Sequence, residues 1–70
     1  MARKSKIQKR LDELKELAAA ENWEALEEAA HKFIEDYEDR AEGYFYRGSA
    51  KLILEKYEDS ITDYDAAIQL

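Results

Sequence analysis

The chain has 70 residues, no cysteine, no proline and a formal net charge of −6. A chain of this length forms one small domain, which buries only about 60% of the surface that the unfolded form exposes. The lack of cysteine excludes disulfide-stapled secretion and any thiolate nucleophile or metal ligand. The sequence has no long apolar stretch, so we expect no transmembrane helix, no signal peptide and a cytoplasmic location.

Positive charge is concentrated at the start of the chain. Residues 1–10 hold five of the eleven Lys and Arg residues and no acid, whereas residues 11–70 hold all seventeen Asp and Glu residues. An acidic body disfavours nucleic acid and an anionic membrane surface as partners. Residues 1–4 are either a phosphate-binding or targeting arm or a solvated terminus, and we expect a disordered, solvated terminus.

Apolar residues recur at helical spacing in four segments, and no segment alternates with period two. The spacing predicts four helices, over residues 5–20, 23–37, 40–54 and 57–69. Connections of a few residues make antiparallel neighbours of successive helices. The sequence therefore predicts an all-α single domain, 1–70, of two consecutive helical hairpins, 5–37 and 40–70.

Three helix starts carry capping signals. Ser5 with Gln8 and Asp39 with Glu42 have the spacing of a capping box, in which each side chain satisfies the other residue's free backbone N–H group. Asn22 is a favourable N-cap for the second helix.

Gly48 lies in the middle of the third predicted helix, where glycine costs about 1 kcal/mol relative to alanine. We expect it to mark a close approach of the third and fourth helices.

The two hairpins share a 34-residue offset. It separates Trp23 from Tyr57 and Ile34 from Ile68, and 34 residues is the tetratricopeptide period. Residues 41–70 resemble a tetratricopeptide repeat in an ordered set of positions: Tyr44, Gly48, Tyr57, Tyr64 and Ala67. Residues 7–40 match more loosely, and a generic four-helix bundle would give the same polar pattern.

The second hairpin departs from the family pattern at three positions. Arg47 replaces the common leucine, Lys51 a common aromatic residue, and Ser60 the usual alanine.

The sequence offers no pattern typical of an active site. Glu28 and His31 form a single Glu-x-x-His, whereas di-iron bundles need two such motifs and two further glutamates. Asp63 and Asp65 point to different faces of a helix. Ser49 has no histidine base within predictable reach. We expect no enzyme, no metal and no cofactor.

The resemblance implies a groove, lined by the first helix of each hairpin, that receives a protein or peptide. On this chain the groove residues would be Glu42, Phe45, Ser49, Leu52 and Ile53 of the second hairpin and, less securely, Gln8, Leu11, Lys15, Ala18 and Ala19 of the first. They do not reproduce the lysine and asparagine of the carboxylate-clamp subclass. The apolar members suit an apolar or amphipathic partner.

A second surface is predicted at the end of the second hairpin. Tyr64, Ile68 and Leu70 would lack a following repeat to cover them, so we expect a homodimer or packing against further repeats. Two hypotheses for function remain open. One is a protein–protein interaction module, and the other is an engineered or truncated repeat scaffold with no natural ligand.

Overall fold

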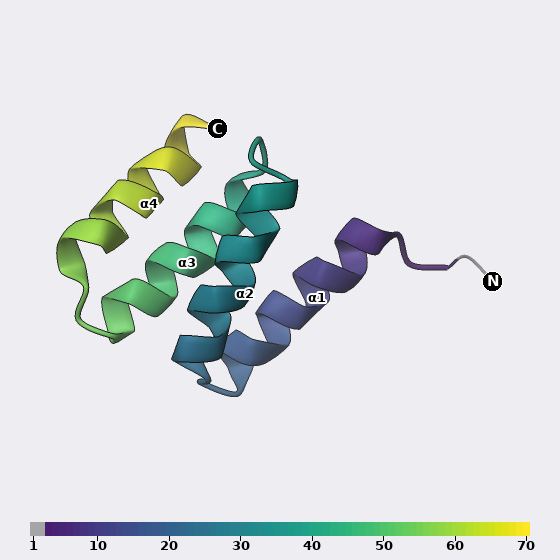
Figure 1. The fold of residues 1–70 in the computed structure, drawn as a ribbon, viewed down its shortest axis with the longest axis horizontal. Helices are drawn as coiled ribbons and strands as arrows, with labels where there is room; N and C mark the ends of the chain where they lie inside the picture. Colours follow the sequence, from purple (N-terminus) through teal and green to yellow (C-terminus); the bar gives the residue numbers. More distant parts are fainter. Residues whose placement is uncertain (1–2) are drawn as a thin grey trace.

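The computed structural model describes residues 3–70, which form four α-helices and no β-strand (Figure 1). The helices are α1 (Lys6–Ala19), α2 (Trp23–Asp36), α3 (Ala41–Ile53) and α4 (Tyr57–Gln69). The all-α prediction and the four predicted segments are confirmed, with each boundary within one residue. Regular apolar spacing and the breaks between segments were therefore sufficient to place the helices.

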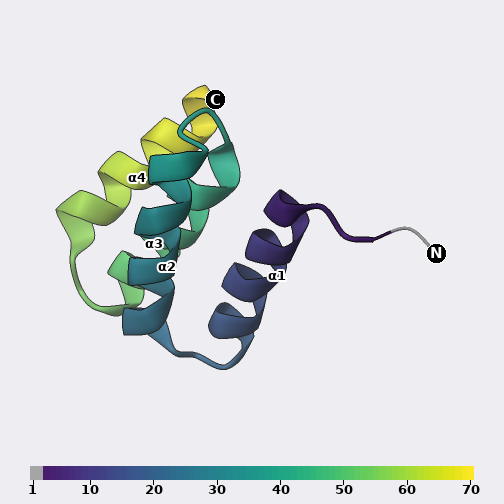
Figure 2. The ribbon, with the colours of Figure 1, turned by 45° about the vertical axis from the view of Figure 1, so that its right-hand side comes forward.

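The helices lie in sequence order, each beside the next (Figures 1 and 2). Helix α3 packs against both α2 and α4 and also touches α1, whereas α4 contacts only α3 within residues 3–70. The result is a slab of 43 × 27 × 16 Å with α1 at one edge and α4 at the other. Each hairpin, α1–α2 and α3–α4, is antiparallel, as the short connections predict.

The turns inside the two hairpins have the same hydrogen bonds, 34 residues apart. Glu21 and Glu55 both adopt a left-handed backbone, with φ of 57° and 65°. The next residue donates its N–H back to the last turn of the preceding helix, from Asn22 to Leu17 and from Lys56 to Lys51. This is the Schellman pattern of a helix C-terminus.

The buried core belongs mainly to the first three helices. It consists of Leu14 of α1, the α2 residues Leu26, Ala30 and Phe33, and Ala50 of α3. Half-buried residues such as Tyr46 of α3 pack around it. The core therefore sits where α3 covers the α1–α2 hairpin.

The capping predictions were only partly correct. Ser5 accepts a hydrogen bond from the backbone N–H of Gln8, but the Gln8 amide donates to Asp12 instead of back to the cap. Asn22 occupies the N-cap position of α2 but makes no side-chain capping bond.

The predicted Asp39–Glu42 box is wrong. Arg40 is the N-cap of α3, and its guanidinium bonds the Glu42 carboxylate. The chain enters α3 one residue later than the box requires, so Asp39 lies outside the cap position.

Both glycines lie at helix contacts. A Cβ built on Gly48 would lie 3.2 Å from the Cβ of Asp63 and 3.3 Å from the backbone oxygen of Ser60, so α3 and α4 approach closely there, as predicted. The contact at Gly43 is tighter, since a Cβ would lie 2.8 Å from a side-chain carbon of Ile34 in α2. This second close approach was not predicted from the sequence.

The start of the chain is described from residue 3 onward. Our expectation of a disordered terminus at 1–4 lies, for residues 1 and 2, outside the described residues. Lys4 pairs with Asp12 at 2.5 Å. Within residues 3–70 no helix combines the length and apolarity needed to cross a membrane.

Replacing Gly48 by leucine should lower the free energy of unfolding by more than about 1 kcal/mol, because the added side chain would push α3 and α4 apart. Urea unfolding followed by circular dichroism measures this. Ile53→Leu, an exposed change on the same helix, is the control and should shift stability by less than about 0.5 kcal/mol. Unchanged stability of Gly48→Leu would contradict the close crossing.

Candidate protein-binding site

An apolar cleft runs along the outer side of the α3–α4 hairpin. Its volume is about 510 Å³, and its lining residues are Ala41, Glu42, Phe45, Tyr64, Ala67 and Ile68. Phe45 is 51% exposed and Ile68 is 81% exposed, which is unusual for large apolar side chains gathered in one place. The cleft is open because no helix within residues 3–70 lies beyond α4 (Figure 1).

Aromatic and hydroxyl contacts shape the floor of the cleft. The rings of Phe45 and Tyr64 lie 5.9 Å apart between centroids in a tilted arrangement. The Tyr64 hydroxyl and the Ser49 hydroxyl share a hydrogen bond of 2.8 Å, and Ser49 also donates to the backbone oxygen of Phe45. Tyr64 is therefore held beside Phe45 with its hydroxyl group hydrogen-bonded.

A buried carboxylate joins α4 to α3. Asp63 is only 2% exposed and accepts two hydrogen bonds from the Arg47 guanidinium, at 2.8 and 2.9 Å. Lys51, one turn further along α3, places its Nζ 3.2 Å from the same carboxylate. Beside them the Ser60 hydroxyl donates to the backbone oxygen of Gly48 at 2.8 Å. Polar groups therefore fill the α3–α4 contact.

The environment of Asp63 favours its charged form. Burial by itself raises the pKa of a carboxyl group, but the hydrogen bonds and charge of Arg47, followed by those of Lys51, outweigh it. The pKa of Asp63 therefore lies below its ordinary value. The same hydrogen bonds to Asp63 raise the pKa of the Arg47 guanidinium, so both partners stay ionised at neutral pH.

Glu42 is the charged member of the cleft lining. It stands in the first turn of α3, where the helix dipole favours an anion. Its pKa lies below the ordinary value because its carboxylate accepts a backbone N–H bond and then one from Arg40. One wall of the cleft therefore carries the Arg40–Glu42 ion pair at its rim.

The structure joins two surfaces that the sequence treated as separate. Glu42 and Phe45 were predicted for the peptide groove, and Tyr64 and Ile68 for self-association, yet all four line one cleft. Leu70, also predicted for self-association, is exposed near the same end of α4. Part of each predicted surface therefore lies in the same cleft.

The remaining predicted groove residues lie outside this cleft. Leu52 and Ile53 are exposed on the last turn of α3. Gln8 and Lys15 are exposed on α1, and Leu11 packs half-buried against the core. Helix α1 lies on the other side of α2 from α4 in both views (Figure 2), so the cleft draws on the second hairpin alone.

Sequence reasoning missed the cluster around Asp63. Arg47 and Lys51 were noted only as departures from apolar family positions, and Asp63 only as half of an acidic pair. The signal was present in the sequence. Arg47 and Lys51 are one helical turn apart on the inward-facing side of the third predicted helix, and Asp63 stands on the inward-facing side of the fourth. Charged side chains at such positions must pair with one another.

The lone histidine belongs to the outer edge of this cluster. The Nδ1 atom of His31 lies 3.0 Å from a guanidinium nitrogen of Arg47. Along residues 3–70, no three His, Cys, Asp or Glu side chains are grouped as metal ligands. The depression in which His31 lies, between α2 and α3, has bases already paired with acids, as Arg47 is with Asp63 and Lys32 with Glu28.

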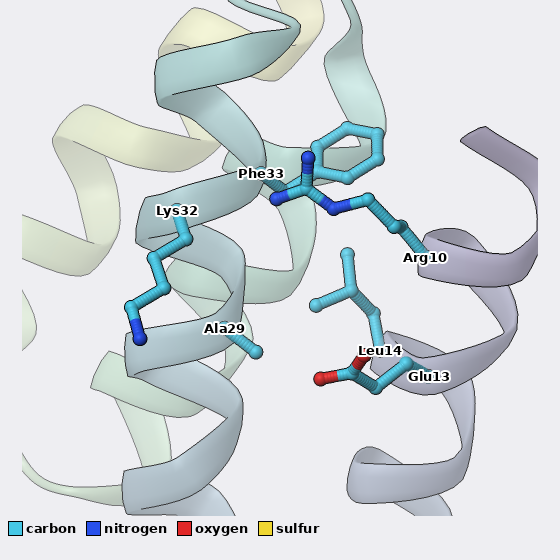
Figure 3. Close-up of a pocket in the computed structure, with 6 residues that line it drawn as sticks. All are labelled: Arg10, Glu13, Leu14, Ala29, Lys32 and Phe33. Carbon is cyan, nitrogen blue, oxygen red and sulfur yellow. The ribbon is translucent and has the colours of Figure 1, made fainter. Parts of the chain in front are cut away.

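A smaller depression of about 190 Å³ separates α1 from α2 (Figure 3). The side chains of Arg10 and Leu14 reach from α1 toward Phe33 on α2. The Arg10 guanidinium lies 5.6 Å from the Phe33 ring centroid and pairs with Asp36 at 2.5 Å. These contacts hold α1 against α2, and Asp36 neutralises the charge of Arg10.

Comparison of the chain with protein-family models, curated proteins and solved structures gives no match. The tetratricopeptide resemblance therefore stays a prediction from the residues.

Asp63→Asn should lower the free energy of unfolding at pH 7 by roughly 3 kcal/mol, because it leaves Arg47 and Lys51 without their buried counter-charge. The pKa of Asp63 is lowered in the folded state, so the stability from its charge is present above the unfolded pKa. It is lost as pH falls through the folded pKa.

The gap between wild type and Asp63→Asn should therefore close on acidification from pH 7 to below about pH 4. Urea unfolding of both proteins across this range measures it. A gap of the same size at both ends of the range would contradict an ionised, paired Asp63.

Proposed function

We propose that the chain is a non-enzymatic protein–protein interaction module, tetratricopeptide-like in architecture, that receives a partner helix in the α3–α4 cleft. The observation that supports this most is the cleft itself, where Phe45 and Ile68 stand exposed on a chain with 40% charged residues. When a partner binds, apolar surface that is exposed in the free protein is removed from water, and this stabilises the complex by about 25 cal/mol per Å² of buried apolar area. We expect this function in the cytoplasm, consistent with a chain without cysteine.

The shape of the cleft favours a helix as the bound element. It follows the seam between two antiparallel helices, and Ile61 and Ile68, seven residues apart, extend its apolar side along α4. A groove of this kind accepts the apolar stripe of an amphipathic helix. The side chains at its floor are fixed by the Ser49–Tyr64 hydrogen bond, so little order must be gained on binding.

Self-association is a second candidate, and the exposure of Ile68 and Leu70 at the end of α4 supports it. It would use the same cleft, since Tyr64 and Ile68 belong to its lining. A following repeat would cover the same residues. These occupants are alternatives for one surface.

The test uses a synthetic amphipathic helix of about 16 residues, long enough to be helical when bound, with leucine and alanine in its stripe and glutamine elsewhere. Titration into labelled protein, followed by nuclear magnetic resonance, should shift the signals of Phe45, Tyr64 and Ile68 most. Ile68→Gln should weaken binding about tenfold, because one buried aliphatic side chain is worth roughly that factor.

The matched control is Ile53→Gln, which makes the same substitution at an exposed position of α3 outside the cleft and should leave affinity unchanged. Signal shifts centred on α1 and α2, or equal losses in the two variants, would show that the cleft is not the binding surface.

A further inference from the structure

In the first hairpin, the groove between the two helices, which corresponds to the α3–α4 cleft, is covered by a further helix. Helix α3 lies on α2 and brings Gly43 so close that a Cβ would stand 2.8 Å from Ile34. In the same contact Leu14 of α1 and Ala50 of α3 enter one buried core. The 34-residue counterpart of Ile34 is Ile68, which is uncovered. The groove between the helices of the second hairpin therefore corresponds to the one that α3 covers in the first hairpin, but no helix within residues 3–70 covers it.

The α4 side of the open cleft is acidic. On α4, Glu58 and Asp65 are seven residues apart, which places them on one stripe next to that of Ile61 and Ile68. On the α3 side, the lining residue Glu42 is already paired with Arg40 at 3.2 Å. Helix α4 contains no Lys or Arg, so an occupant of the cleft meets only acids on the α4 side and an existing ion pair on the α3 side.

The bases of the second hairpin are all paired already. Arg47 and Lys51 pair with the buried Asp63, Lys56 pairs with Glu27 of α2, and Arg40 pairs with Glu42. Among the ion pairs of residues 3–70, none involves Asp65, which follows the cleft residue Tyr64, or Glu58, which continues the same stripe toward the start of α4. The negative charge beside the cleft is thus available to a partner.

These borders disfavour a second copy of the chain as the occupant. Pairing two α4 helices about a twofold axis sets the same acids against each other. Head-to-tail packing, in which α1 of one copy covers α4 of another as α3 covers α2, fails for a different reason. The α1 counterparts of Gly43 and Ala50 are Lys9 and Glu16, which are charged and exposed.

We propose that the occupant of the α3–α4 cleft is an amphipathic helix of another protein whose apolar stripe is bordered by Lys or Arg on the side that faces α4. This inference rests on the proposed function and adds the charge of the partner to it. Arg10 of α1 gives an internal precedent, since it lies beside an apolar stripe and pairs with Asp36 of α2. Apolar contact supplies the burial, and the basic borders supply selectivity over acidic helices.

The experiment compares two peptides with the same leucine and alanine stripe of about 16 residues, one with lysine on both borders and one with glutamate. The lysine peptide should bind at least about tenfold more tightly, from two or three ion pairs at the rim of the cleft. The difference should shrink between roughly 50 mM and 500 mM salt as screening shortens the range of charge interactions.

A pair of charge-reversal variants separates local pairing from attraction to the net charge of −6. Glu58→Lys with Asp65→Lys should remove the preference for the lysine peptide. The control is Glu24→Lys with Glu35→Lys, which makes the same change in net charge on exposed positions of α2, and Glu24, like Glu58, lies in the first turn of its helix. The control should keep most of the preference.

Each other result has a defined meaning. If both variant pairs lower the preference equally, attraction is to net charge and the inference falls. If Ile68→Gln weakens both peptides equally and the glutamate peptide binds as well as the lysine peptide, the cleft is a binding site without charge selection. If Ile68→Gln changes neither affinity, the proposed function falls as well. A dimer mass in sedimentation equilibrium, unaffected by the lysine peptide, identifies a second copy as occupant and overturns the inference.

Discussion

The position of α4 depends on one buried carboxylate. Helix α4 packs only against α3 within residues 3–70, and the one ion pair that ties its start to another helix is that of the N-cap Lys56 with Glu27 of α2. Apolar contacts are non-directional, whereas Asp63 must meet Arg47 and Lys51 at fixed points one turn apart on α3. Removing any of the three leaves charge in a place with little access to water. Together with the hydrogen bonds of Ser60 to Gly48 and of Ser49 to Tyr64, the charged cluster therefore sets the register of α4 on α3.

This arrangement explains why the two hairpins differ in what they expose. The first hairpin turns Leu14, Leu26 and Phe33 inward, and α3 covers them. In the second hairpin the inward positions of α4 hold Ser60 and Asp63, which bond to α3. The large apolar side chains of α4 are therefore left at the outer side, where they form the cleft. The sequence of α4 places polar residues at its inward positions and large apolar residues at its outer positions. This one pattern produces both the polar contact with α3 and the apolar cleft.

Much of the fold could be predicted because helix positions follow from local spacing. The capping predictions were less accurate because side-chain caps compete with backbone hydrogen bonds at the helix ends. Asn22, for example, donates its backbone N–H to close the Schellman turn of α1 while its side chain makes no cap. The Arg47–Asp63 pair spans 16 residues, so only the packing of two helices brings it together. For the same reason the sequence placed Phe45 and Ile68 on two surfaces that the structure shows to be one cleft.

Amide hydrogen exchange of the wild-type protein and of Asp63→Asn tests most directly whether the carboxylate holds α4 in place. Exchange reports the free energy of local opening, residue by residue. In the wild type, buried amides of α4 should be protected to nearly the same degree as those of α2. In Asp63→Asn the α4 amides should lose protection by a larger factor than the α2 amides, because the α1–α2–α3 core does not involve Asp63. Equal loss in both helices, or full protection of α4 in the variant, would show that other contacts position α4.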